Sequence, residues 1–190
     1  LGYSPMKTGV AYLAVAGSAI ITSTIAAQLV TRVGVKPVIV AGMAFLAAGL
    51  LYFTQVSVGG TYLGDLLPGF LLIAMGLGFS FVPISIAALA GVQASEAGLA
   101  SGLFNTSQQI GGALGIAALS AIATSKTSGG VSSGTPLPKA LTDGFEAAFI
   151  WGAAVAAVGI VVSLVLIRRS ELETPVEEHE EAPETVLEAA

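Results

Sequence analysis

Five long apolar runs are the feature that most constrains the fold of this chain. Each is close to or above the roughly 20 residues that a helix needs to cross the hydrocarbon core of a bilayer, and none has a charge near its centre. The runs are Gly9–Val30, Pro37–Val56, Gly64–Ala90, Ala97–Thr124 and Gly144–Ile167. Lipid cannot satisfy exposed backbone groups, and barrel strands would be shorter and alternating. The sequence therefore predicts an all-α membrane protein with five transmembrane helices.

The composition excludes several broad classes. Hydrophobic residues make up 54% of the 190 residues and charged residues 10%, against about 25% charged in a soluble domain. A soluble domain, a disordered chain and a nucleic-acid binder are thereby excluded. The chain has no Cys, so disulfides and thiolate metal sites are absent. Because it begins at Leu1 rather than Met and shows no signal peptide, we expect a fragment.

The chain lacks the residue patterns of an enzyme. A metalloprotease motif needs two His residues on one helix, and a serine hydrolase needs a base beside its nucleophile. The one His, His179, lies among the acidic residues near the C-terminus, and no phosphate-cradling Gly-Lys-Ser/Thr loop occurs. We therefore expect no enzymatic activity, no cofactor and no metal.

Charges near the span ends predict the orientation, since Lys and Arg at span ends stay in the cytoplasm. One side holds Arg32, Lys36, Arg168 and Arg169, tight against span ends. The other side holds Lys7, Lys126 and Lys139. This bias places the N-terminus outside a cell membrane and the C-terminus in the cytoplasm.

Two polar segments flank the fifth span. Residues 170–190 carry eight Glu and are expected to form a disordered, solvated cytoplasmic tail. Residues 125–143 are rich in Gly, Ser and Pro and are expected to form a flexible loop.

Polar and small residues share one side of the fourth span and one side of the first. In the fourth span they are Gly98, Ser101, Gly102, Asn105, Gln108, Gln109 and Gly112. In the first span they are Gly17, Thr24, Gln28 and Thr31. Such stripes face protein or water in a membrane, either as helix–helix contacts or as the lining of a substrate path, and the residues alone leave both readings open.

The third span combines a polar stripe with a proline. Its stripe consists of Asp65, Gly69, Gly76, Ser80 and Pro83. Pro83 predicts a kink, which shapes packing or adjoins a binding site. Asp65 is a possible ionisable site at the outer end, with an interfacial or a coupling role. The second and fifth spans are almost purely aliphatic and are expected to be peripheral helices that face lipid.

Four segments resemble the major facilitator superfamily. The segment Leu29–Pro37 is similar to its recurring short basic loop, with Arg32, Gly34 and Lys36 matching and Thr31 in place of an Asp. The segment Ala97–Ala117 resembles a helix of the fourteen-span drug:proton antiporters, and Gly2–Pro5 and Ala87–Val92 fit the same family.

The resemblance implies that the five spans are core helices eight to twelve, most of the C-terminal six-helix bundle. It implies proton-coupled multidrug efflux by alternating access, with the bilayer, a missing N-terminal half, protons and an amphipathic small-molecule substrate as partners. The lining expected for that substrate is Phe79, Ser80, Phe81, Asn105 and Gln108. The alternatives are a truncated bundle that transports nothing and an exporter of another solute.

Overall fold

A computed structural model describes residues 5–56, 58 and 61–167 of the chain. It contains five long helices, α1 (Pro5–Val33), α2 (Val35–Phe53), α3 (Leu67–Leu89), α4 (Ala97–Ser132) and α5 (Leu137–Leu166), and a π-helical turn, η1 (Tyr62–Leu66). Each long helix belongs to a segment long and apolar enough to cross a membrane. The prediction of an all-α membrane protein with five spanning helices is confirmed. The acidic tail expected at 170–190 lies outside the described residues.

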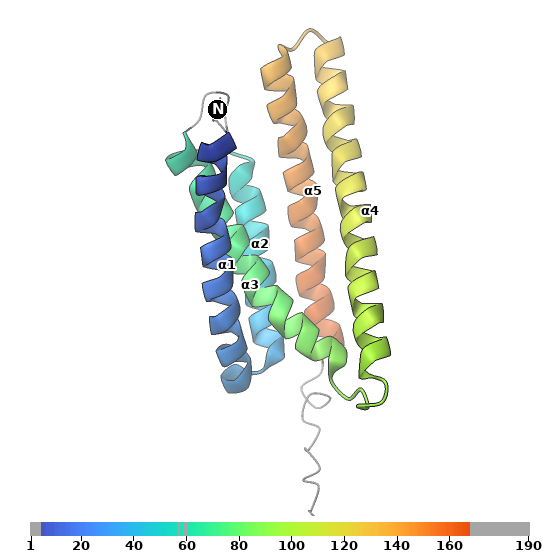
Figure 1. Cartoon of the computed structure of the whole chain (residues 1–190). Coiled ribbons are helices and arrows are strands. Elements are labelled where there is room, and N and C mark those ends of the chain that lie inside the picture. Colours follow the sequence, from blue (N-terminus) through green and yellow to red (C-terminus); the bar gives the residue numbers. More distant parts are fainter. Residues whose placement is uncertain (1–4, 57, 59–60, 168–190) are drawn as a thin grey trace, which may run out of the picture.

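The helices form a group of three and a hairpin. Helices α1, α2 and α3 pack together, and α4 and α5 run side by side, with α5 also packed against α2. Figure 1 shows the α4–α5 hairpin rising beyond the upper end of the other three helices. The turns from α1 to α2 and from α3 to α4 lie at the opposite, lower end.

The flexible loop expected at residues 125–143 is instead mostly helix. Helix α4 has 36 residues and is about 54 Å long at 1.5 Å per residue, against a hydrocarbon core of about 30 Å. The two helices hold each other in this projecting part, because Thr127 of α4 donates a hydrogen bond to the Ala140 carbonyl of α5 (3.2 Å). Within α5 itself, Lys139 pairs with Asp143 (3.2 Å). Only residues 133–136 connect α4 to α5, and Gly134 takes a φ of 86° in this turn.

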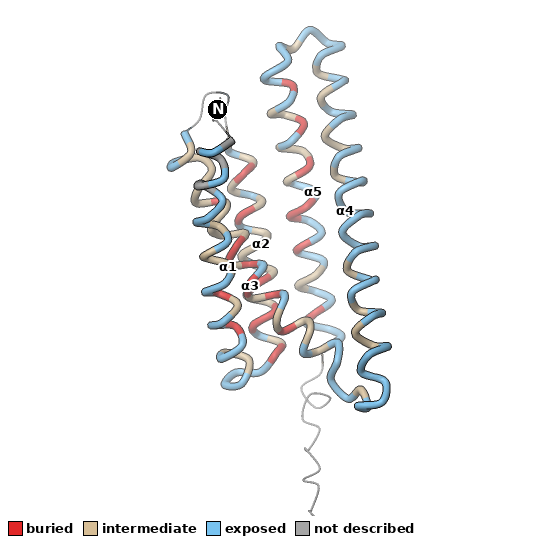
Figure 2. Tube along the Cα trace, in the orientation of Figure 1, coloured by how far each residue is buried: buried red, intermediate tan, exposed pale blue. Residues whose placement is uncertain are grey.

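Glycines bring α2 and α3 into backbone contact. A Cβ atom added to Gly76 would lie 2.5 Å from Leu46 Cγ and 2.9 Å from the Gly42 carbonyl oxygen, and one added to Gly49 would lie 3.0 Å from the Ile73 nitrogen. Figure 2 shows the buried residues of α2 and α3 where the two helices meet. Such close approach supplies the van der Waals packing that joins helices in lipid, where the hydrophobic effect between them is weak.

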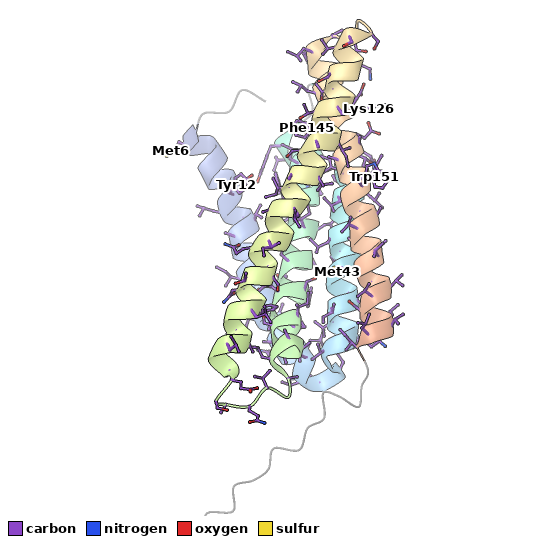
Figure 3. All side chains as sticks on the ribbon, turned by 90° about the vertical axis from the view of Figure 1, so that its right-hand side faces the viewer. Met6, Tyr12, Met43, Lys126, Phe145 and Trp151 are labelled. Atoms are coloured by element: carbon purple, nitrogen blue, oxygen red, sulfur yellow. The ribbon has the colours of Figure 1, made fainter. Side chains whose placement is uncertain are left out.

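The expectation that the second span faces lipid at the periphery is wrong for the packing in this chain. Helix α2 lies between α3 and α5, and Phe53 at its end meets both Phe70 (ring centroids 5.0 Å) and Phe149 (5.3 Å). Nearer the start of α2, Met43 (labelled in Figure 3) contacts α5 at Gly159. Aliphatic composition cannot separate a lipid-facing helix from a packed one, because lipid and a neighbouring helix are equally apolar.

A glycine substitution tests the α2–α3 contact. Gly76→Ala is expected to lower the free energy of unfolding by about 1–3 kcal/mol, because the new methyl group overpacks the contact. The measurement is thermal or denaturant unfolding in detergent. Gly111→Ala is the matched control, since a Cβ there meets nothing within 4 Å, and it should be neutral or slightly stabilising. Equal stability of the two variants would contradict the close contact.

Candidate functional site

The structure separates the three residues of α3 that were expected to line a substrate path. Ser80 is 5% exposed and faces Gly42 of α2, so its expected place on an open lining is not observed. Its hydroxyl is a buried polar group without a hydrogen-bond partner in the described structure. Phe79 stacks on Phe45 of α2, with ring centroids 5.9 Å apart. Phe81 points elsewhere and is 57% exposed. Of the three, Phe81 has the most open side chain.

Three other residues of this stripe are buried as Ser80 is, namely Gly69, Gly76 and Pro83. Gly69 lies against the Phe53 ring, and the Pro83 side chain is fully buried. Helix α3 continues through Pro83 to Leu89. Within this chain the stripe is therefore a helix–helix contact, which is one of the two readings that the sequence left open.

The polar stripe of α4 lies open. No residue of α4 is buried, and Cβ atoms added to Gly98, Gly102 or Gly112 would meet nothing within 4 Å. Asn105 is exposed and Gln108 partly exposed. Of the other two polar residues, Ser101 is partly exposed and Gln109 is exposed. The described residues thus provide no partner for these glycines and leave the amides accessible.

The same side of α4 changes its environment along the helix. By the 3.6-residue period, Asn105 lies on the side of α4 that carries Ala123 and Thr127, and those two residues approach Gly144 of α5. Nearer the start of α4 this contact ends, and Val155 and Val162 of α5 are exposed. The polar stripe of α4, from Gly98 to Gly112, therefore lies in the part of α4 that does not contact α5. No described residue covers it there.

Helix α1 packs through the side opposite to its polar stripe. Thr22 and Ala26 are buried, and Thr22 Oγ1 lies against Gly78 of α3. The expected interface residues Gly17, Thr24 and Gln28 lie on the far side, where Thr24 and Gln28 are exposed. Sequence reasoning missed the Thr22–Gly78 contact. The available signal was Gly78 itself, which lies two residues from Gly76 and therefore on the other side of α3.

The basic loop is a tight turn tied to another helix. Gly34 has a φ of 89°, which suits glycine, and joins α1 directly to α2. Lys36 Nζ donates a hydrogen bond of 2.6 Å to the Leu164 carbonyl oxygen of α5. That carbonyl lies in the last turn of its helix, where a cation is favourable. Arg32 is exposed at the end of α1.

Asp65 stabilises the η1 turn that precedes α3. Its carboxylate accepts hydrogen bonds from the backbone N–H and the hydroxyl of Thr61. Tyr52 of α2 donates to the nearby Gly64 carbonyl (2.6 Å), which holds this turn against the bundle. Among the described residues, no group of three or more His, Cys, Asp or Glu side chains is placed to hold a metal ion.

Comparison with known proteins identifies similar chains named for drug resistance and export. The puromycin resistance protein pur8 of Streptomyces alboniger is 36% identical over 174 residues, which is 88% of this chain and 35% of that protein. The cephamycin export protein CmcT of Amycolatopsis lactamdurans is 34% identical over 130 residues, 68% of this chain and 27% of that protein. The multidrug resistance protein Stp of Mycobacterium tuberculosis is 32% identical, over 64% of this chain and 22% of that protein.

These matches place the chain in a family but cover only part of each relative. The chain spans about a third or less of the length of the curated relatives it matches. The family model for the Major Facilitator Superfamily matches residues 1–116, which is more than half of the chain. The five apolar helices and these relatives agree with that match. The chain belongs to the major facilitator superfamily.

Proposed function

We propose that this chain is the C-terminal part of a proton-coupled multidrug efflux transporter that works by alternating access in the cell membrane. The relatives named for puromycin resistance, cephamycin export and multidrug resistance support drug efflux. The shares of 35%, 27% and 22% support a longer whole protein, in which an N-terminal half accompanies this bundle. Proton coupling follows from the resemblance to drug:proton antiporters.

The open polar stripe of α4 is the observation that carries the proposal. Asn105 and Gln108 stand on a spanning helix with no buried residue. An amide facing lipid costs free energy that a protein or water partner removes. The stripe therefore supplies Asn105 and Gln108 to a substrate path, while Gly98, Gly102 and Gly112 admit a helix of the absent part. On α1, Gly17, Thr24 and Gln28 form a second such face.

Substrates of this path are amphipathic small molecules. An apolar cavity with a few polar groups binds such ligands, because the apolar walls supply affinity and the polar groups fix orientation. Phe81 offers an exposed ring for this wall, whereas Ser80 does not belong to it because it packs on α2. A bundle that transports nothing, or one that exports another solute, is the alternative that efflux assays decide.

Removing the α4 amides tests the lining. In the whole transporter, Asn105→Leu with Gln108→Leu is expected to lower efflux of a fluorescent cationic drug about tenfold or more, because the path loses its polar groups. The measurement is energised efflux from cells, with equal surface abundance verified. Ser107→Leu is the matched control, because Ser107 lies on the opposite side of α4, and it should retain efflux. Unchanged efflux in the double variant would refute the lining.

Persistence of wild-type efflux after collapse of the proton gradient would refute the coupling.

Neighbouring residues of α3 are expected to respond differently. Phe81→Ala should weaken the apparent affinity for an aromatic drug several-fold, because an exposed ring is lost from the path. Ser80→Ala should leave drug affinity unchanged and stability equal or higher, because a buried hydroxyl without a partner is removed. The measurement is the drug concentration that gives half-maximal efflux. A reversed pattern would place Ser80, and not Phe81, in the path.

The orientation is directly testable because this chain contains no Cys. A membrane-impermeant maleimide added to intact cells should label Lys126→Cys and leave Arg32→Cys unlabelled, with both labelled after permeabilisation. This result is expected because the tight cations at the Arg32 end hold that end in the cytoplasm. Labelling of Arg32→Cys alone in intact cells would invert the orientation.

A further inference from the structure

A pocket lies beside the turn that joins α1 to α2. Its volume is about 520 Å³, and it is lined by residues 30–37 of the turn and by Ile86 and Ala90 of α3. Two of its lining residues, Arg32 and Lys36, are cationic, and most of the others are aliphatic. The pocket therefore joins a charged rim to an apolar wall within one small volume.

The two cations of this pocket differ in how they are held. Lys36 uses one of its three N–H donors on the Leu164 carbonyl, which fixes its ammonium at the end of α5 and leaves two donors. Arg32 is exposed, and no ion pair or hydrogen bond of its side chain occurs in the described structure. Neither cation is neutralised by an acidic side chain of the described residues. An anion in the pocket would therefore meet one fixed ammonium and one free guanidinium.

The pocket lies at the level where lipid phosphates are expected. Arg32 stands in the last turn of the spanning segment Tyr12–Val33, so it marks the boundary of the hydrocarbon. Next to it Val33 is 45% exposed, and Ile86 on the facing end of α3 is 43% exposed. Cations beside exposed aliphatic side chains match the phosphate and the first acyl carbons of one phospholipid molecule.

We propose that this pocket binds an anionic phospholipid, with its phosphate on Arg32 and Lys36 and its acyl chains along Val33 and Ile86. Basic pockets between spanning helices bind anionic headgroups in this way. The guanidinium contributes two parallel N–H donors to a phosphate, and the ammonium contributes a point charge. This site is independent of drug transport and stands if the transport proposal fails.

The apolar wall favours a lipid over the other available anions. A free phosphate ion would gain no binding free energy from the exposed aliphatic side chains of Val33 and Ile86. The acidic residues of 170–190 follow α5, whose end Lys36 contacts, and they are a competing source of negative charge. Carboxylates on a polar segment gain little from an aliphatic wall at the hydrocarbon boundary, whereas acyl chains gain burial.

Lipid retention by the purified 190-residue chain tests the proposal. The probes are phosphatidylglycerol and phosphatidylcholine, added to the chain in detergent and counted as bound molecules by native mass spectrometry. Wild type should retain phosphatidylglycerol in preference to phosphatidylcholine. Arg32→Gln should reduce that retention about tenfold, the loss expected for a charge-assisted contact to phosphate. Its unfolding temperature without added lipid should stay unchanged, because the Arg32 side chain has no hydrogen bond or ion pair to lose among the described residues.

A matched control and two competitors separate the outcomes. Lys126→Gln removes an exposed cation on the upper part of α4, far from the α1–α2 turn (Figure 3), and should keep full retention. Equal loss in Lys126→Gln would mean nonspecific charge attraction and would overturn the site. Displacement of the lipid by equimolar glycerol 3-phosphate would assign the site to a soluble phosphate. Phosphatidylglycerol retention that is low in wild type and rises severalfold only after deletion of residues 170–190 would assign the site to the acidic segment.

Discussion

Backbone contact between α2 and α3 through glycine is the interaction on which the rest of this bundle depends. In lipid, two aliphatic helices gain little by meeting, because each leaves equally apolar surroundings. Gly42 and Gly49 on α2 and Gly69 and Gly76 on α3 change this balance by letting backbone atoms and short side chains pack closely. Helix α1 joins the same centre where Thr22 meets Gly78, and α5 joins α2 at Gly152 and Gly159. In each of these contacts, a side chain or the backbone of one helix packs against a glycine of its neighbour.

The distribution of these contacts explains why α4 differs from every other helix. It has seven glycines against three in α3, yet a Cβ atom added to any glycine from Gly98 to Gly115 would meet nothing within 4 Å. The same residue type that joins α2 to α3 is therefore present on α4 without its partner. Among the described residues, the glycines of α2 and α3 are packed and those of the first half of α4 are not, which is a pattern expected for part of a larger helical assembly.

The sequence predicts helices far better than it predicts their neighbours. Hydropathy located all five spans, because the membrane requires internally bonded backbone wherever the chain crosses it. It failed at residues 125–143, where Gly and Ser outside the membrane suggested a loop although α4 and α5 hold each other at Thr127 and Ala140. It also failed to separate Ser80 from Phe81. Both lie on one helix, and only the position of α2 decides that Ser80 is buried while Phe81 is exposed.

The residues of the basic turn between α1 and α2 have different structural roles. Gly34 supplies the backbone conformation, and Lys36 fastens the start of α2 to the end of α5. Thr31, which stands where the family loop has an Asp, bonds to the Gln28 carbonyl of its own helix (2.7 Å) and adds no charge. Arg32 therefore keeps its charge without a neighbouring acid at position 31. Its guanidinium has no ion pair among the described residues, which agrees with the proposed binding of an anionic lipid.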